Sequence, residues 1–389
     1  MVAIVAMLAV ASSGRSTTAA ENPVEIDVVL PMTGNAALLG ATGAQAVELI
    51  EKQVNSEGGI NGRPVHFVVY DDQTSPQVAV QIANELLQKS PPVILGSSVT
   101  AMCNAMAPLM RKGPVMYCYS PGIQPEPGSY VFSATVPTYG LVETMLRFFH
   151  QRGWNRLAVL MSTDATGQDG DRSVTRALAL PDLKDMTIVA REYFNSSDVT
   201  VQAQLERIKA AQPQAMISWT TGAAMGTVMR GMIQAALDVP FAPSSGNISY
   251  TFMRQYAAVL PRQMYLSSNQ GTARGQHLSL DPRTEVAKKK YYDLFKTVGV
   301  LPDTGSEISW DATMILVEAL RHVGPHPTAE KMRDYIAHLK NYAGISGVYD
   351  FEKYPQRGLN PNSAVIVRWN PEGPSFEAIT QPGGVPIKP

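Results

Sequence analysis

The sequence has little of the chemistry that most enzymes and metalloproteins use. Its 389 residues include only two cysteines and six histidines. CxxC and HExxH spacings are absent, and His322 and His326 are separated by Pro325, which argues against their sharing one helix. We therefore expect neither a metal site nor a cofactor.

Charge is also sparse and nearly balanced. Lys and Arg total 32 against 33 Asp and Glu, and charged residues make up 17% of the chain. No basic stripe interleaved with aromatic residues occurs, so we expect no nucleic-acid partner. Beyond residue 20 no uninterrupted apolar run reaches the roughly 18 residues that a membrane-spanning helix needs. A composition that is 45% hydrophobic is typical of a globular protein, and the length suits about two domains.

Motifs that cradle phosphates or activate nucleophiles are missing. The chain contains no GxGxxG after its first predicted strand, no GxxxxGK[ST] and no GxSxG. The histidines do not lie at predicted strand ends, so a general base would have to be a carboxylate such as Asp72 or Asp164. For each of them, helix capping or an ion pair within its own lobe is the favoured explanation. We expect a binding protein without catalytic residues, not an enzyme.

The first twenty residues differ from the rest. The apolar run MVAIVAMLAV is too short to span a bilayer and is followed by a small, polar stretch that ends in Thr18, Ala19 and Ala20. This pattern predicts a signal peptide over residues 1–20 and a periplasmic mature protein, although Arg15 lies on the wrong side of the apolar run. A disordered or lipid-facing N-terminus is the alternative.

Strand and helix patterns alternate along the chain, in two blocks. Strands are predicted at 24–30, 65–70, 93–95, 115–119, 157–161, 187–193 and 215–219, with helices between them. One of these helices is predicted to begin with Ser75 as N-cap and Pro76 as first helical residue and to run to about residue 89, and another is predicted over 171–179. This order predicts an α/β fold with two doubly wound parallel sheets. Further helices are predicted at 284–298, 310–322 and 329–339. Crossings between the two lobes are expected near 135–137, 264–268 and 345–349, leaving a cleft between the lobes.

Doubly wound sheets bind ligands at the carboxyl ends of their strands. In this sequence those ends are rich in Gly, Ser, Thr and Asn and poor in Lys, Arg and His. In the segment VILGSSVTAMC, the predicted strand ends at Gly96 and is followed by Ser97, Ser98 and Thr100 at a predicted helix start. Hydroxyls at a helix N-terminus favour an anion. Capping of that helix is the alternative role for the same hydroxyls.

The cysteines follow this segment. If Cys103 lies in the helix and Cys118 ends the next strand, both lie at the same edge of the sheet. A disulfide and two buried thiols both remain open at this stage.

Several motifs together resemble the solute-binding proteins of branched-chain amino acid ABC transporters. They are PMTG at 31–34, GGINGR at 58–63, DDQTSP at 71–76, SPG at 120–122, WDATMILVEAL at 310–320 and GISGVYDF at 344–351. The resemblance implies a type I periplasmic binding fold, with two lobes joined by three hinge strands. Lobe one would comprise residues 21–136 and 266–346, and lobe two residues 137–265 and 347–389. The resemblance also implies a membrane permease as partner, and we expect the protein to be a monomer.

The resemblance further implies where a ligand binds. Amino-acid binders of this family hold the ligand carboxylate with hydroxyls and backbone N–H groups of lobe one. The matching positions here are Ser98, Thr100, Ala101, Ser120, Ile123 and Gln124. The acid that faces the α-ammonium in lobe two aligns with Ser245, near Asn247. The family's tyrosines align with Leu39, Thr166 and Thr221, and Trp219 adds an apolar wall.

The aligned lobe-two positions therefore lack the charge that would hold an amine. A buried ammonium without a partner costs several kcal/mol, on the order of other unpaired buried charges. We expect a small aromatic or branched aliphatic carboxylate without an α-amino group. The alternatives are a hydrophobic amino acid, its ammonium held by Asp164 or Asp169, and a ligand sensor of the same fold.

Overall fold

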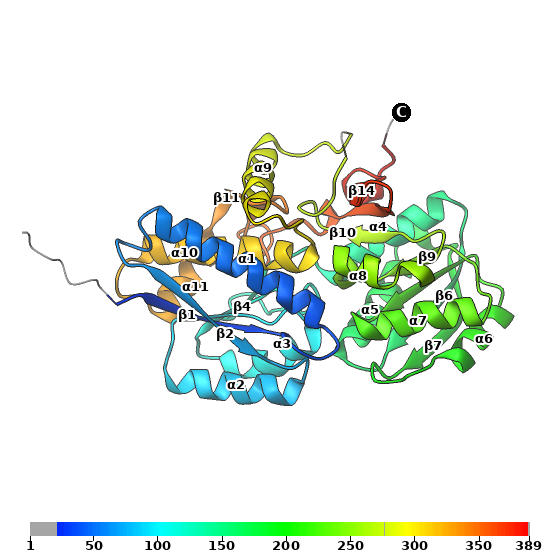
Figure 1. The fold of residues 1–389 in the computed structure, drawn as a ribbon, viewed down its shortest axis with the longest axis horizontal. Helices are drawn as coiled ribbons and strands as arrows, with labels where there is room; N and C mark the ends of the chain where they lie inside the picture. The colour runs from blue at the N-terminus through cyan, green and yellow to red at the C-terminus, as the bar shows by residue number, and fades with distance from the viewer. Residues whose placement is uncertain (1–21, 276, 388–389) are drawn as a thin grey trace, which may run out of the picture.

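The computed structural model describes residues 22–275 and 277–387. The predicted signal peptide, residues 1–20, lies outside the described residues. Within them the chain forms the two parallel-sheet lobes expected of the type I periplasmic binding fold, placed side by side in Figure 1.

The first lobe is built on a five-stranded parallel sheet with the order β2-β1-β3-β4-β5. Its strands are β1 (Val24–Leu30), β2 (Val65–Asp71), β3 (Val93–Gly96), β4 (Val115–Cys118) and β5 (Val131–Ser133). The helices α1 (Ala37–Ser56) and α10 (Thr304–Val323) cover one face, and α2 (Pro76–Gln88) and α3 (Thr100–Met106) cover the other (Figure 1). A 3₁₀ turn, η1 (Ala107–Met110), continues α3.

The second lobe has a four-stranded parallel sheet with the order β7-β6-β8-β9. Its strands are β6 (Arg156–Ser162), β7 (Thr187–Phe194), β8 (Ala215–Trp219) and β9 (Phe241–Pro243). The covering helices are α4 (Thr138–Gln151), α5 (Ala165–Leu178), α6 (Gln202–Ala210), α7 (Ala223–Gln234) and α8 (Tyr250–Gln255). Leu157 and Val159 pack in one hydrophobic cluster while Ala158 and Leu160 pack in another, because successive strand residues point to opposite faces.

The chain passes between the two sheets three times. The first passage links β5 to α4, and Val136 donates its N–H to the Asn269 side chain of the second passage at 3.1 Å. The second passage follows β10 (Leu266–Ser268), which pairs with β13 (Val365–Asn370) and β14 (Ser375–Ala378) in a small antiparallel sheet. It leads to α9 (Pro282–Thr297) and α10. The third follows α11 (Ala329–His338), β11 (Lys340–Ala343) and β12 (Val348–Asp350).

Buried polar contacts join the second passage, helix α10 and the loop between β11 and β12. The carboxylate of Glu307, in α10, accepts hydrogen bonds from the Gly271 N–H and the Thr272 hydroxyl of the second passage. The same carboxylate accepts a bond from Ser346, beside β12, at 3.2 Å. The Glu307 side chain therefore links the second passage to the loop between β11 and β12.

The strands and helices predicted from periodicity mostly match the structure, with instructive differences. The strands β5 and β9 have only three residues each, too few for an alternating pattern to register. Helix α5 begins at Ala165 instead of 171, because Asp164 caps it by accepting the Gly167 N–H. Ser75 caps α2 as predicted, with Pro76 as first helical residue.

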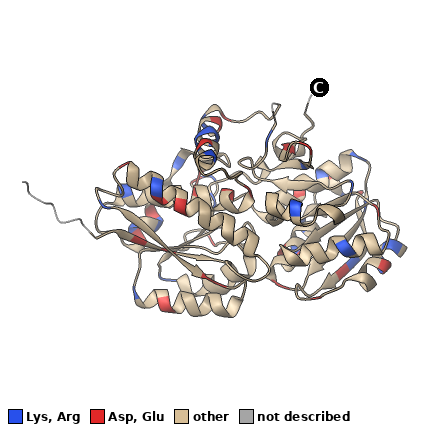
Figure 2. Ribbon diagram, viewed as in Figure 1, with Lys and Arg blue, Asp and Glu red and all other residues tan. Residues whose placement is uncertain are grey.

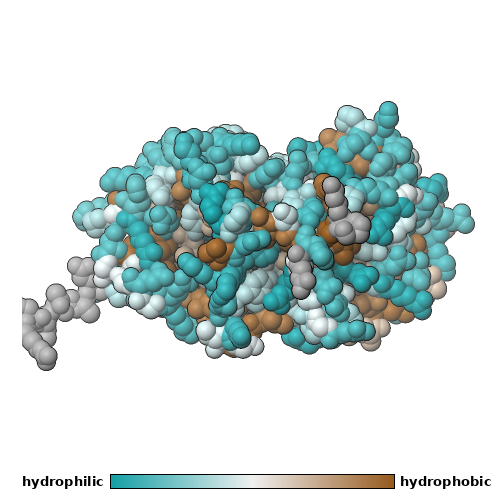
Figure 3. All heavy atoms as spheres, turned by 90° about the horizontal axis from the view of Figure 1, so that it is seen from above, coloured by the Kyte–Doolittle hydropathy of each residue, from teal (hydrophilic) through white to brown (hydrophobic). Residues whose placement is uncertain are grey.

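Charged residues of both signs are spread over the outer helices of both lobes (Figure 2). The face in Figure 3 is mostly hydrophilic, with small separate hydrophobic patches, and narrows between the two halves. In residues 22–275 and 277–387, no helix combines the length and the apolar character needed to cross a membrane.

Candidate ligand-binding site

A cavity lies between the two lobes, at the carboxyl ends of both sheets. Nine of its sixteen lining residues carry a hydroxyl: Ser98, Thr100, Ser120, Thr135, Thr166, Thr221, Ser244, Ser245 and Thr304. The others are Leu39, Val99, Pro121, Trp219, Gly246, Asn269 and Ile308. The cavity is therefore lined by neutral groups only.

The lobe-one wall of this cavity is formed by a pair of hydroxyls. Thr100, the first residue of α3, and Ser120, after β4, are joined by a 2.8 Å hydrogen bond. The N-cap of α3 is Val99, which makes no side-chain capping bond, and the Ser98 hydroxyl is buried without a protein partner. These hydroxyls therefore do not cap the helix, and Ser98 retains its capacity to bond a ligand. Ser97 has a different role, since its hydroxyl donates to buried Asp72 at 2.6 Å.

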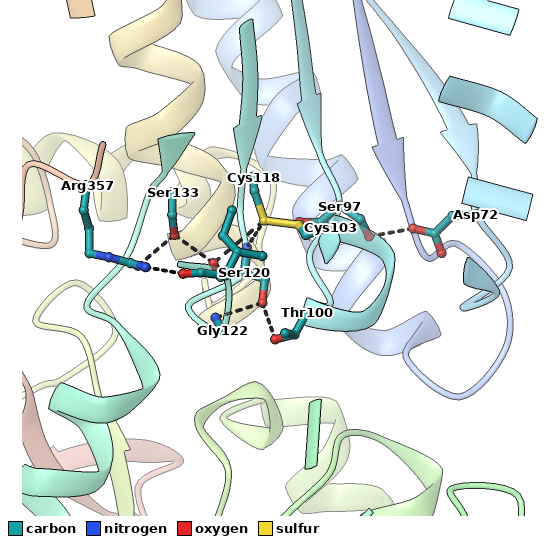
Figure 4. Close-up of a disulfide and its surroundings, with 10 residues drawn as sticks. Asp72, Ser97, Thr100, Cys103, Cys118, Ser120, Gly122, Ser133 and Arg357 are labelled. Carbon is teal, nitrogen blue, oxygen red and sulfur yellow. Dashed lines mark hydrogen bonds between the residues drawn. A yellow bond between two sulfur atoms is a disulfide. The ribbon is translucent and has the colours of Figure 1, made fainter. Parts of the chain in front are cut away.

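A disulfide holds this wall from behind. Cys103 lies one turn after Thr100 in α3, and Cys118 is the last residue of β4, two residues before Ser120. The two form a disulfide, and both are fully buried (Figure 4). The sequence left open whether the two cysteines form a disulfide or remain buried thiols, and the structure contains the disulfide. It links the two segments that carry the hydroxyl pair.

A buried arginine supports the same wall, and sequence reasoning did not identify it. The Arg357 guanidinium donates to Ser133 Oγ and the Thr135 carbonyl, each at 2.8 Å, and to the Ile123 carbonyl at 2.6 Å. Ser133 in turn donates to the Ser120 carbonyl at 2.8 Å (Figure 4). Burial lowers the pKa of Arg357 to about 10, so it remains a cation at neutral pH. Arg357 lies in a turn with no motif around it, so nothing in the sequence marks it.

The lobe-two wall consists of Thr166, Trp219, Thr221 and Ser245, all of which line the cavity. Trp219 ends β8 and is only 4% exposed, and the Thr166 hydroxyl is buried without a protein partner. Asn247 organises this wall from behind. Its side-chain amide donates to the Thr220 carbonyl at 2.9 Å, and its Oδ1 accepts the Gly222 N–H at 2.9 Å.

Four of the predicted site residues lie elsewhere. Asn247 does not line the cavity, because its amide is used to hold the loop at 220–222. Ala101 lines an adjoining cavity together with Met102 and Asp164. Ile123 and Gln124 line a separate surface pocket on lobe one, because the loop after Gly122 turns away from the cleft. Tyr119, which follows β4, also lies outside the cavity, since it is fully buried and its hydroxyl is hydrogen-bonded to the Thr313 hydroxyl at 3.0 Å.

Four residues at the floor of the cavity were not among the predicted site residues: Thr135, Asn269, Thr304 and Ile308. They come from the passages between the lobes and from the start of α10. Only the tertiary structure brings them beside the strand ends, although predicted crossings near 135–137 and 264–268 were a partial signal.

Two carboxylates lie near the cavity without lining it. Asp164 caps α5 and accepts the Ser162 hydroxyl at 2.8 Å. Asp169 lies one turn further along α5, is 3% exposed, and has one carboxylate oxygen without a hydrogen-bond partner. Elsewhere in the described residues, no group of three or more His, Cys, Asp or Glu side chains is arranged to hold a metal ion.

The lobes touch across the mouth of the cleft. The Asn35 side chain, in the loop between β1 and α1, donates to the Ser196 carbonyl of lobe two at 3.3 Å. The Ala223 N–H, at the start of α7, donates to the Asn35 carbonyl at 3.3 Å. The preceding Gly222 has a φ of +69°, and a Cβ there would overlap the Asn35 carbonyl oxygen. The structure therefore shows a closed cleft.

A cavity of neutral hydrogen-bonding groups between two closed lobes defines a solute-binding protein. The chain matches the family model described as periplasmic binding protein over residues 23–374. It belongs to this family, whose members bind solutes and are not enzymes.

Curated relatives give the same family. The chain is 24% identical over 246 residues to a leucine-, isoleucine-, valine-, threonine- and alanine-binding protein of Pseudomonas aeruginosa. That match covers 62% of this chain and 65% of the relative, slightly under two thirds of its length. It is also 32% identical over 92 residues to a Leu/Ile/Val-binding protein homolog of Brucella abortus, which covers 24% of each protein.

Solved structures share the fold at low identity. An extracellular ligand-binding receptor of Rhodopseudomonas palustris HaA2 superposes with a TM-score of 0.80 at 19% identity, covering 91% of this chain and 99% of that one. A Streptococcus pneumoniae branched-chain amino acid transporter substrate binding protein, in complex with isoleucine, gives 0.76 at 16%, covering 92% and 99%. A fatty acid ABC transporter substrate-binding protein of Thermomonospora curvata gives 0.76 at 16%, covering 92% and 91%.

Proposed function

We propose that this protein is the exported solute-binding component of an ABC importer and that it binds a small organic carboxylate without an α-amino group. The membrane permease of that importer would be its partner. The observation that carries the ligand class is the neutral lining of the cavity, which offers nine hydroxyls and no acidic side chain.

The hydroxyl lining suits a carboxylate. Either Thr100 or Ser120 donates in the bond that joins them, so the other member of the pair can donate to an anion, as can the unpartnered Ser98 and Thr166 hydroxyls. Hydrogen bonds to an ionised acceptor are stronger than those between neutral groups. Leu39, Val99, Trp219 and Ile308 supply the apolar surface against which an aromatic or branched aliphatic body would pack.

Matched ligands test the ligand class directly. Leucine and isocaproate share one carbon skeleton and differ by the α-amino group, as do phenylalanine and hydrocinnamate. Titration calorimetry should give at least tenfold tighter binding for the acid of one pair, because a buried ammonium would lack a counter-charge. Tighter binding of the amino acid in both pairs would contradict the proposal. Native mass spectrometry of the purified protein would add the mass of any retained solute.

Amino-acid binding is the second candidate, and a specific observation favours it. Asp164 lines the cavity that adjoins the main one, and the two cavities share Val99, Thr166 and Thr221. An amine placed in the adjoining cavity would meet this carboxylate. Asp164→Asn would then abolish leucine binding, whereas for an acid ligand it would change affinity little.

A further inference from the structure

Asp169 is a buried carboxylate at the contact between the lobes. It projects from α5 of lobe two toward the Ser120–Gly122 loop of lobe one. A Cβ built on Gly122 would lie 2.8 Å from Asp169 Oδ2 and would also overlap Thr100 Oγ1. The Asp169 carboxylate of lobe two and the Thr100 hydroxyl of lobe one therefore both lie close to Gly122. Asp169 is 3% exposed with the lobes closed.

The cationic side chains near Asp169 neutralise its negative charge only weakly. Arg172, one turn along α5, brings Nη2 to 3.6 Å from Oδ1, but its side chain is 64% exposed. Arg357 is buried but donates to three oxygens of lobe one. On the neighbouring α4, Glu143 is negative and is paired with Arg147 and Arg176. The Thr138 hydroxyl, also on α4, is buried and makes no hydrogen bond, and neither does Asp169 Oδ2.

Burial raises the pKa of Asp169 above its ordinary range, while the Thr138 hydroxyl and the Arg172 and Arg357 guanidinium groups oppose the rise. A ligand carboxylate at Thr100 would act in the same direction as burial, because two like charges close together disfavour ionisation of either. Opening the lobes would return Asp169 to water and its pKa toward the ordinary value.

We infer that Asp169 takes up a proton from solvent when the lobes close on a carboxylate. The bound anion is then accompanied by this proton, whereas an amino acid would bring a positive charge of its own in its α-ammonium group. The proton forms an O–H bond with a carboxylate oxygen of Asp169 and comes from bulk water or buffer. This inference rests on the proposed function, since it requires an anionic ligand beside Thr100.

The sign of the pH dependence follows from the direction of the pKa change. Because the pKa of Asp169 is higher in the closed form than in the open form, protonation favours the closed, liganded protein. Affinity should therefore rise as the pH falls through the closed-form pKa and level off near the ordinary Asp pKa of about 4. One proton limits the slope to about tenfold per pH unit.

The test is titration calorimetry with isocaproate and hydrocinnamate between about pH 5.5 and 7.5, where both acids remain ionised. Each titration is repeated in buffers of different ionisation enthalpy, so that the heat reports proton uptake. The native protein should take up a fraction of a proton that increases as the pH falls. Asp169→Asn should bind the acid with no uptake and no pH dependence. Asp293→Asn, an exposed carboxylate on α9, is the matched control and should behave like the native protein.

Three results would overturn the inference. They are the absence of proton uptake by the native protein, equal uptake by Asp169→Asn, and loss of acid binding by a folded Asp169→Asn protein, which would make Asp169 the partner of a cation. Should the native protein bind leucine and no acid, the proposed function fails. NMR titration of the Asp169 carboxyl carbon in the closed, leucine-bound protein then decides separately whether closure raises the pKa of Asp169, and an ordinary pKa in that closed form rejects the inference.

Discussion

The two walls of the cleft are built differently. On lobe one, Thr100 and Ser120 are joined to each other, bridged from behind by a disulfide and supported by the buried Arg357. On lobe two, Thr166 lies in the first turn of α5. Thr221 lies in the 220–222 loop that the amide of Asn247 holds, and Ser245 begins the 3₁₀ turn that contains Asn247. The difference indicates that the lobe-one wall is held together by contacts of its own, independently of lobe two. In the proposed function this wall would receive the anion, and lobe two would close over it.

The largest expected effect comes from preventing the two walls from meeting. Gly222→Ala places a methyl group on the Asn35 carbonyl oxygen at a φ of +69°. Overpacking against Asn35 occurs only when the lobes are closed and costs up to about 3 kcal/mol, so ligand affinity should fall by as much as about a hundredfold. The strain of the positive φ is shared by the open and closed forms and should lower stability instead. Calorimetry measures the loss of affinity. Gly62→Ala, at a φ of +86° with no atom within 4 Å, is the matched control for strain alone and should retain affinity. Equal losses in the two variants would show that contact across the cleft is unimportant.

Removing one hydroxyl from the lobe-one wall should have the next largest effect. Thr100→Val keeps the shape of the side chain and removes its bond to Ser120 and to an anion. A hydrogen bond to a charged group contributes about 1.5–3 kcal/mol, so the dissociation constant should rise tenfold or more. The control is Thr187→Val, an exposed position on β7. An unchanged dissociation constant would remove Thr100 from the site.

The disulfide should affect stability more than binding. Replacing both Cys103 and Cys118 with Ser opens a bridge that spans 15 residues and should lower the free energy of unfolding by about 3 kcal/mol. Affinity should fall only several-fold, since Arg357 and Ser133 still hold the Ser120 loop. Denaturant titration and calorimetry of the same sample separate the two effects. Because the chain has only these two cysteines, reduction of the native protein opens the same bridge without any substitution. The reduced native protein should therefore show the same changes in stability and affinity as the double Ser variant. A loss of affinity as large as that of Thr100→Val would show that the bridge alone preassembles the wall.

Much of the fold could be predicted from the sequence, because periodicity and capping are local. Ser75 with Pro76 marked the start of α2, and the buried runs at β1 and β8 were located to the residue. Ser98, Thr100 and Ser120 could also be assigned to the cavity, since residues that follow parallel strands gather at one edge of the sheet. Ile123 and Gln124 were predicted with them but line a separate surface pocket. The Ile123 carbonyl accepts a hydrogen bond from Arg357, which is 234 residues away in the chain, and a contact of this kind cannot be predicted from local patterns.

The sequence by itself determined two α/β blocks with hydroxyl-rich strand ends and few charges, because strand and helix periods and residue types are properties of the chain alone. Only the tertiary structure decided which groups share the cleft. It brought Thr135, Asn269 and Thr304 to the cavity floor and buried Arg357 behind Ser120. It also placed Asp169 against Gly122. These contacts join segments far apart in the sequence, so their energies arise only when both lobes are folded and closed.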